Sequence, residues 1–137
     1  MSIAYSEFEM QVRSLLKARG YEWPELMRNI WINGQYVFRF SYEHRECAAI
    51  EFGRADRPIN TMFPGFDDPW LSQCLRPYSG WLTTIGIEPQ TFAHCLGGWE
   101  SGGLRQPDFA SLLTIIEATL PKIEAVASNA PLQAQRP

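Results

Sequence analysis

The sequence has little of what nucleic-acid-binding and membrane proteins need. Its 12 Lys and Arg residues are outnumbered by 15 Asp and Glu residues, which gives the 137-residue chain a formal net charge of −3. A mildly acidic chain without clustered cations is poorly suited to a phosphate backbone. Its apolar runs are short, whereas a transmembrane helix needs about 20 apolar residues. We therefore expect no binding to nucleic acid or to a membrane.

Cysteine is also scarce. The chain contains Cys47, Cys74 and Cys95, an odd number without close spacing. This pattern is typical of reduced thiols and not of a disulfide framework. The first residues lack the basic and apolar regions of a secretory signal. These features predict a cytoplasmic protein.

The sequence shows no spacing typical of a metal, nucleotide or cofactor site. His94 adjoins Cys95, but His44 and Cys74 are distant, whereas zinc ligands come in close pairs. The glycine pairs do not fit a phosphate-binding loop. We therefore expect no metal, no cofactor and no catalytic residue. One alternative is a small enzyme in which Cys95 or Cys74 uses a histidine, since such partners need to be close only in space.

Apolar and aromatic side chains, in contrast, are abundant and regularly spaced. They make up 45% and 13% of the chain, enough for one buried core at this length. Ser6 and Glu9 have the spacing of a capping box, and Gly20 is a typical left-handed stop, which predicts a helix over 6–19. The apolar positions of this helix are Phe8, Val12, Leu15 and Leu16.

The next segment changes to the period of two that is typical of strands. Residues 29–32, 35–42 and 47–52 predict a three-stranded antiparallel meander whose first turn is Asn33-Gly34. Aromatic residues alternate along its second strand: Tyr36, Phe38, Phe40 and Tyr42. Sequence alone does not decide which face of this meander packs on the helices.

The second half of the chain predicts a short helix, two strands and a long helix. The short helix begins after Asp68 and ends before Pro77. Residues 81–87 are rich in strand-forming side chains, whereas residues 91–99 fit either a partner strand or a helix. A final helix opens at Pro107-Asp108, and Pro121 is expected to kink or divide it. The whole is an α+β fold with a single domain over 1–127 and a flexible tail over 128–137.

This order of elements resembles the class I type III secretion chaperones. Three segments carry the resemblance, which spans residues 6–126: Phe8 to Gly20, Gly80 to Thr84 and Asp108 to Glu117. The resemblance implies a cytosolic homodimer that binds the non-globular N-terminal segment of a secreted effector and keeps it competent for secretion. No cofactor or nucleotide is implied.

The resemblance also implies two sets of contact residues. The effector would lie in grooves formed by the first helix and the sheet, and an edge strand could pair with it. The implied partner-binding residues are Leu15, Trp31, Tyr36, Phe38 and Phe40. The implied dimer interface comprises Trp70, Leu71, Leu75, Leu82 and Thr84. A different binding role is the alternative, in which a small acidic immunity or inhibitor protein blocks a toxin as a monomer.

Overall fold

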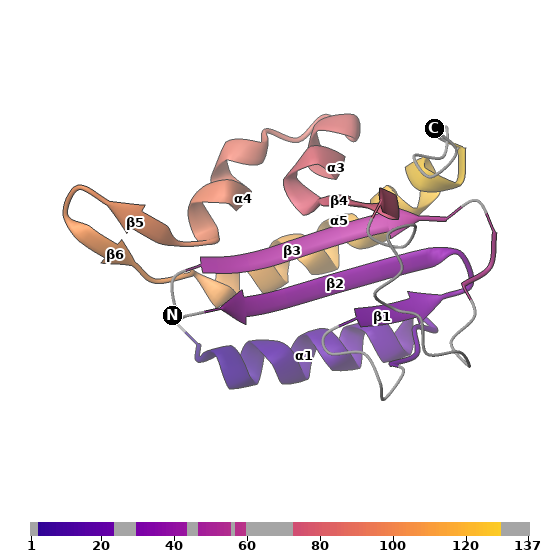
Figure 1. Ribbon diagram of the computed structural model, residues 1–137, viewed down its shortest axis with the longest axis horizontal. Coiled ribbons are helices and arrows are strands. Elements are labelled where there is room, and N and C mark those ends of the chain that lie inside the picture. The colour runs from indigo at the N-terminus through magenta and orange to yellow at the C-terminus, as the bar shows by residue number, and fades with distance from the viewer. Residues whose placement is uncertain (1–2, 24–29, 44–46, 56, 60–72, 130–137) are drawn as a thin grey trace.

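In the computed structural model, which describes residues 3–23, 30–43, 47–55, 57–59 and 73–129, helices cover one face of a four-stranded antiparallel sheet (Figure 1). The predicted α+β class is confirmed. The elements in chain order are α1 (Tyr5–Ala18), β1 (Ile30–Asn33), β2 (Tyr36–Glu43), β3 (Cys47–Arg54), β4 (Leu75–Pro77), α3 (Tyr78–Thr84), α4 (Pro89–Cys95), β5 (Gly98–Glu100), β6 (Gly103–Arg105) and α5 (Phe109–Asn129).

The first helix and its stop are close to the prediction, but the capping box is wrong. Ala4 is the N-cap of α1 and makes no side-chain cap hydrogen bond, so Ser6 lies inside the helix. Glu9 instead accepts a hydrogen bond from the Tyr5 hydroxyl, with 3.4 Å between the hydroxyl oxygen and Oε2. Gly20 has a φ of 91°, which confirms the left-handed stop.

The predicted meander is present as β1, β2 and β3, in that order across the sheet. Asn33 pairs with Tyr36, so the two-residue turn is Gly34–Gln35, one residue later than predicted. Gly34 supplies the positive φ of 61° that the turn needs. The Asn33 amide is used elsewhere, because its Nδ2 donates to the Arg19 carbonyl at 3.0 Å and ties β1 to the end of α1.

A fourth strand replaces the end of the predicted short helix. Most of that helix lies outside the described residues, but Leu75 belongs to β4 and pairs with Gly53 of β3. Gly53 is required by this close approach: a Cβ there would lie 1.9 Å from the Cys74 carbonyl oxygen.

The strand predicted over residues 81–87 is wrong. Residues up to Thr84 form α3, because Tyr78, Trp81 and Leu82 are spaced by three and four residues and all three are buried. Residues 91–99 fitted either a strand or a helix in the sequence, and the structure shows a helix, α4, that ends at Cys95. The two further strands follow it as the β5–β6 hairpin.

The C-terminal helix α5 lies along the centre of the covered face of the sheet, with α1 on one side and α3 and α4 on the other (Figure 1). Asp108 caps it, since Oδ1 accepts a hydrogen bond from the Ser111 N–H at 3.1 Å. The helix runs through Pro121, so of the two expected effects division is wrong, and a kink stays a prediction; Pro121 is exposed, and the neighbouring Leu120 and Ile123 are fully buried. It ends at Asn129, two residues into the predicted tail.

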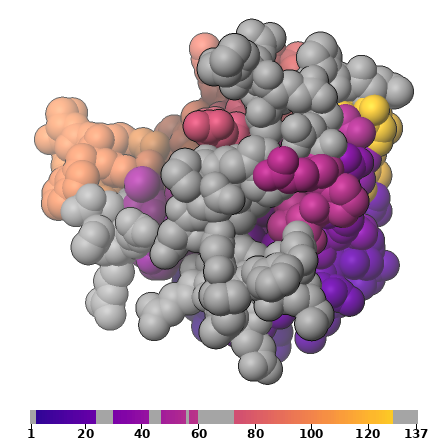
Figure 2. Space-filling model, turned by 45° about the vertical axis from the view of Figure 1, so that its right-hand side comes forward, coloured from indigo at the N-terminus to yellow at the C-terminus, as the bar shows by residue number. Residues whose placement is uncertain are grey.

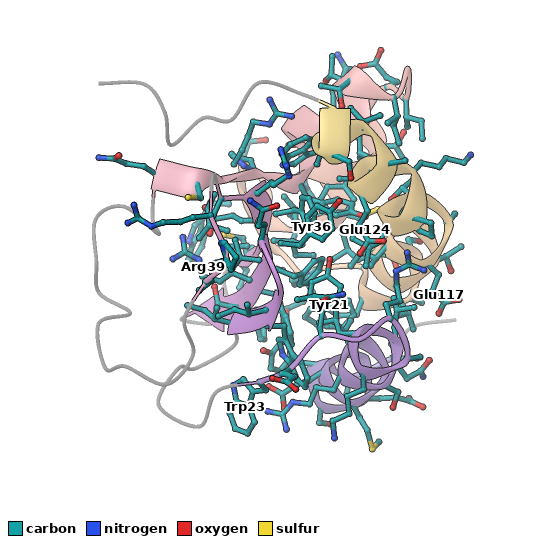
Figure 3. All side chains as sticks on the ribbon, turned by 90° about the vertical axis from the view of Figure 1, so that its right-hand side faces the viewer. Tyr21, Trp23, Tyr36, Arg39, Glu117 and Glu124 are labelled. Carbon is teal, nitrogen blue, oxygen red and sulfur yellow. The ribbon has the colours of Figure 1, made fainter. Side chains whose placement is uncertain are left out.

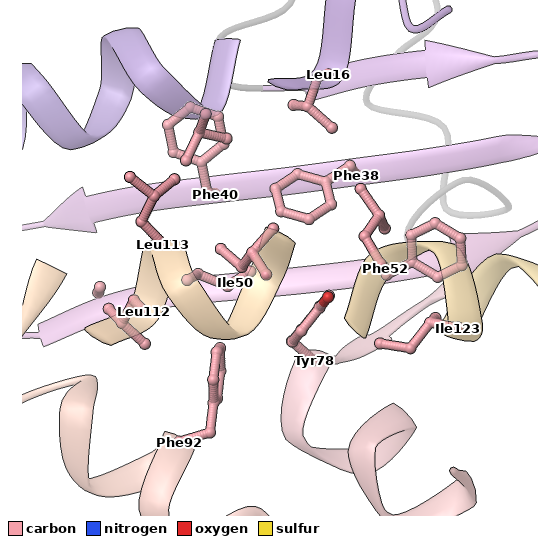
Figure 4. Packing of buried hydrophobic residues seen from close by; sticks show 14 of the residues in the cluster. Leu16, Phe38, Phe40, Ile50, Phe52, Tyr78, Phe92, Leu112, Leu113 and Ile123 are labelled. Carbon is pink, nitrogen blue, oxygen red and sulfur yellow. The ribbon is translucent and has the colours of Figure 1, made fainter. Parts of the chain in front are cut away.

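The main core lies between the sheet and these helices (Figure 4). Phe38, Phe40, Ile50 and Phe52 of the sheet face Leu112 and its neighbours on α5. A smaller apolar cluster, Ile32 and Val37 with Ile30, Ile59 and Leu75 against them, lies on the other face. The meander therefore places its aromatic face in the core.

Candidate functional site

The aromatic residues predicted to bind a partner are mostly inside the protein. Trp31, Phe38 and Phe40 are each 1% exposed or less, so the expectation that they form an open groove is wrong. The physical reason is that α5 and α1 cover the face to which these side chains point. Leu15 and Tyr36 are half-buried against the same core.

Of the predicted dimer-interface residues, the structure describes Leu75, Leu82 and Thr84. Leu82 is fully buried in the core, so its assignment to an interface is wrong. Leu75 is half-buried against the smaller cluster, and Thr84 is exposed at the end of α3 instead of lying in a strand. Trp70 and Leu71 lie outside the described residues.

The structure instead reveals a cleft between the C-terminal half of α1 and strand β1. It has a volume of about 420 Å³ and is lined by Arg13, Lys17, Tyr21, Glu22, Trp23 and Trp31, and we call it the Trp23 cleft. The Trp23 ring, 38% exposed, stacks on buried Trp31 with the ring centroids 6.2 Å apart and the planes at 23°. The guanidinium of Arg13 lies 4.9 Å from the centre of the Trp23 ring.

The backbone fixes the position of Trp23. After the stop at Gly20 the chain turns back, and Glu22 forms two backbone hydrogen bonds of 2.8 Å with Ile32 of β1. This bridge places the next residue, Trp23, beside Trp31. It also means that the outer edge of β1 is already paired at Ile32, so the predicted addition of a partner strand finds that position occupied.

A polar network holds the floor of the cleft in place. The carboxylate of Glu124 on α5 accepts hydrogen bonds from the Arg19 guanidinium and, at 2.6 Å, from the Tyr21 hydroxyl. The Tyr36 hydroxyl donates to the Glu124 carbonyl at 3.2 Å. Figure 3 shows Tyr21, Tyr36 and Glu124 converging between the sheet and the helices. The network joins α1, β2 and α5 directly behind the cleft.

The electrostatics keep the Tyr21 phenol and the Arg19 guanidinium protonated. Burial, and then the hydrogen bond to Glu124, raise the pKa of Tyr21 far above its ordinary value, so the phenol stays a donor. The same carboxylate raises the pKa of Arg19 through its hydrogen bond. A permanent cation and a protonated phenol therefore share one carboxylate.

A second exposed indole lies on the β5–β6 hairpin. This hairpin projects away from the body of the protein (Figures 1 and 2), and Trp99 is 68% exposed on it. Arg105 forms an ion pair with Glu100 across the hairpin, and its Nε donates to the His94 carbonyl at 3.2 Å. The contacts of the hairpin are thus mainly local.

The thiols give a Cys/His nucleophile little support. Cys95 is buried, and burial is the main reason that the pKa of its thiol is raised, whereas a nucleophilic thiolate needs a lowered pKa. His94 points its exposed side chain to solvent, and Cys74 is buried. Among the described residues, no group of three or more His, Cys, Asp and Glu side chains is placed to hold a metal ion.

The exposure of Trp23 and of Trp99 was not predicted from the sequence, although each residue had a signal. Trp99 lies between Gly97-Gly98 and Gly102-Gly103, and such glycine pairs favour a turn that leaves a large ring without a core to enter. Trp23 precedes Pro24, which favours an extended backbone at the residue before it.

None of the helices in the described ranges has both the length and the hydropathy needed to cross a membrane. No protein-family model matches the chain, and no curated protein and no solved structure matches it significantly.

Proposed function

We propose that the protein is a non-enzymatic, cytoplasmic binding protein that holds a short segment of another protein in the Trp23 cleft, as an export chaperone holds the N-terminal segment of a secreted effector. The observation that carries the proposal is the stacked pair of Trp23 and Trp31 beside α1. A rigid, partly exposed indole with a polar rim is typical of a protein contact.

The size of the cleft favours side chains over a folded surface as its occupant. Its volume of about 420 Å³ falls at the lower end of the range of about 300–1,000 Å³ found for small-ligand sites. A few side chains of an extended segment would fill it. The segment loses conformational entropy when it becomes ordered on binding. Because the Trp23 ring is already in position, the protein itself adds little to this entropy cost.

A homodimer would present two such clefts and so strengthen binding to a segment that reaches both. Light scattering coupled to size-exclusion chromatography tests this part of the proposal. We expect the mass of a dimer at micromolar concentration. A stable monomer would contradict the dimer, while binding by a single cleft would remain to be judged by the next experiment.

Selection of random 12-residue peptides displayed on phage tests the cleft itself. The full chain is immobilised, and the selected peptides are re-tested on Trp23→Ala and Trp99→Ala variants that keep the circular dichroism of the parent. We expect the peptides to lose binding on the Trp23→Ala variant and to keep it on the Trp99→Ala variant. Equal binding to the parent and to the Trp23→Ala variant, or a failure to select any peptide, would overturn the proposal.

The projecting hairpin favours a second candidate, an inhibitor that blocks a toxin. A hairpin with an exposed indole is suited to entering a concave site on a folded partner, where Trp is a frequent anchor. This candidate predicts the opposite pattern: capture of a folded partner that is sensitive to Trp99→Ala and unaffected by Trp23→Ala. Co-purification of each variant with the product of the adjacent reading frame distinguishes the two.

A further inference from the structure

We infer that the Trp23 cleft selects an acidic segment, one in which a carboxylate neighbours a large apolar side chain. This inference rests on the proposed function and adds the chemistry of the partner. It is drawn from the charges around the cleft, which differ in sign from those of the chain as a whole.

Two cations lie on the α1 wall of the cleft. Arg13 and Lys17 are one helical turn apart, and among the described residues that line the cleft Glu22 is the acidic one. The described lining is therefore cationic on balance, on a chain with a formal net charge of −3. Such a local reversal of sign favours an anionic partner and disfavours a cationic one.

The hydrogen-bonding capacity of Arg13 is not used up. Its Nε is shielded from solvent and has no hydrogen-bond partner among the described residues. Its ion pair with Glu9 is long at 3.8 Å and partly exposed, so it is weak. An incoming carboxylate at hydrogen-bond distance from Nη2 of the partly exposed side chain would satisfy Arg13 better than Glu9 does at 3.8 Å, because a short guanidinium–carboxylate hydrogen bond is charge-assisted.

The apolar and cationic parts of the cleft are adjacent. Arg13 lies over the Trp23 ring, so a carboxylate bound by Arg13 would lie next to the indole. The neighbouring side chain of the same segment would then pack on the exposed part of Trp23. The cleft would thus recognise two features of the partner, a carboxylate that Arg13 binds and a neighbouring side chain that packs on Trp23.

Matched peptides test the inference. The tightest 12-residue peptide selected on the full chain is synthesised with its Asp and Glu residues and again with Asn and Gln in their place, and both are titrated by fluorescence polarisation. We expect enrichment of acidic residues in the selection and about tenfold weaker binding of the amide version. The Arg13→Gln/Lys17→Gln double variant should bind the acidic peptide about tenfold more weakly and the amide version as the parent does. Lys122→Gln, an exposed position on α5, is the matched control and should change neither affinity.

The outcomes separate this inference from the proposed function. If binding requires Trp23 but the acidic and amide peptides bind equally, the charge selection is wrong and the binding cleft stands. If binding does not require Trp23, both fail. Single-stranded oligonucleotides of 12 nucleotides serve as a competing anion; displacement of the acidic peptide by them at equal concentration would overturn selection for a protein segment.

Discussion

Trp23 and Trp99 are both exposed, but their supports differ. Trp23 stacks on Trp31, a buried residue of the central sheet, and its backbone is pinned to β1 by the bridge at Glu22. Trp99 extends from a hairpin of three-residue strands, which are held by the pairing of β5 with β6 and by the ion pair of Arg105 with Glu100. Exposure of a ring is therefore a weak indication of a site when considered alone. A ring held in one orientation binds with less loss of conformational freedom than a ring on a mobile support.

The largest effect is expected where the support of Trp23 meets the core. Trp31→Ala should lower the free energy of unfolding by about 3–5 kcal/mol, because it leaves a cavity beneath Trp23. Urea denaturation followed by circular dichroism measures this loss. Trp31→Phe keeps an aromatic platform and should lose less. A loss below about 1 kcal/mol for Trp31→Ala would show that Trp31 supports Trp23 no better than the hairpin supports Trp99.

Glu124→Ala tests the network behind the cleft. It leaves the Tyr21 hydroxyl and the Arg19 guanidinium without their shared acceptor, so a loss of about 2–3 kcal/mol in unfolding free energy is expected. Glu117→Ala is the matched control, since Glu117 is an exposed carboxylate on the same helix (Figure 3), and its effect should stay within about 0.5 kcal/mol. Equal losses for the two variants would contradict the role given to the network.

Alkaline pH should loosen the Trp23 region before it affects the hairpin. Burial raises the pKa of Tyr21 far above the unfolded value of about 10. A raised pKa in the folded state means that the stability contribution is complete below pH 10 and is lost as the pH rises beyond it. Thermal melts at increasing pH, with tyrosinate absorbance alongside, measure this loss. Tyr21→Phe should make the decline shallower, and an unchanged slope would exclude Tyr21 as its cause.

The smallest effects concern the two rings themselves. Trp23→Ala removes the stacking contact with Trp31 and the cation–π contact with Arg13 and should cost about 1 kcal/mol of stability. Trp99→Ala should change stability by no more than about 0.5 kcal/mol. Chemical denaturation of both variants under one set of conditions compares them. A Trp99→Ala loss equal to that of Trp23→Ala would mean that the hairpin is tied to the body by contacts with its indole.

Elements were predicted correctly where the hydrophobic period and the residues that end the element indicate the same structure. Prediction failed where the local secondary-structure preference and the burial pattern indicate different structures. The apolar stripe that ends at Gly20 is compatible only with a helix, and the alternation along β2 only with a strand. Residues 81–84 favour a strand by local preference, but buried Trp81 and Leu82 share a helical face with Tyr78. The resemblance placed Tyr36, Phe38 and Phe40 of β2 on a partner-binding surface, whereas α1 and α5 cover the face to which they point.

The candidate site was harder to predict than the fold. The Trp23 cleft is assembled by the bridge between Glu22 and Ile32 and by the pairing of Arg19 with Glu124, which are ten and 105 residues apart along the chain. Neither pairing leaves a local pattern in the sequence. Exposure of Trp99, in contrast, follows from the glycine pairs that flank it.

The contact between α1 and α5 has a consequence for synthesis on the ribosome. The meander is assembled from neighbouring residues and can pair as soon as β3 emerges, whereas the apolar stripe of α1 waits for a helix that is translated about a hundred residues later. At elongation rates of about 5–20 residues per second, Phe8 and Leu16 lack this cover for at least several seconds. During that interval the apolar stripe of α1 is open to chaperones, and it is covered only when the apolar face of α5 packs against it.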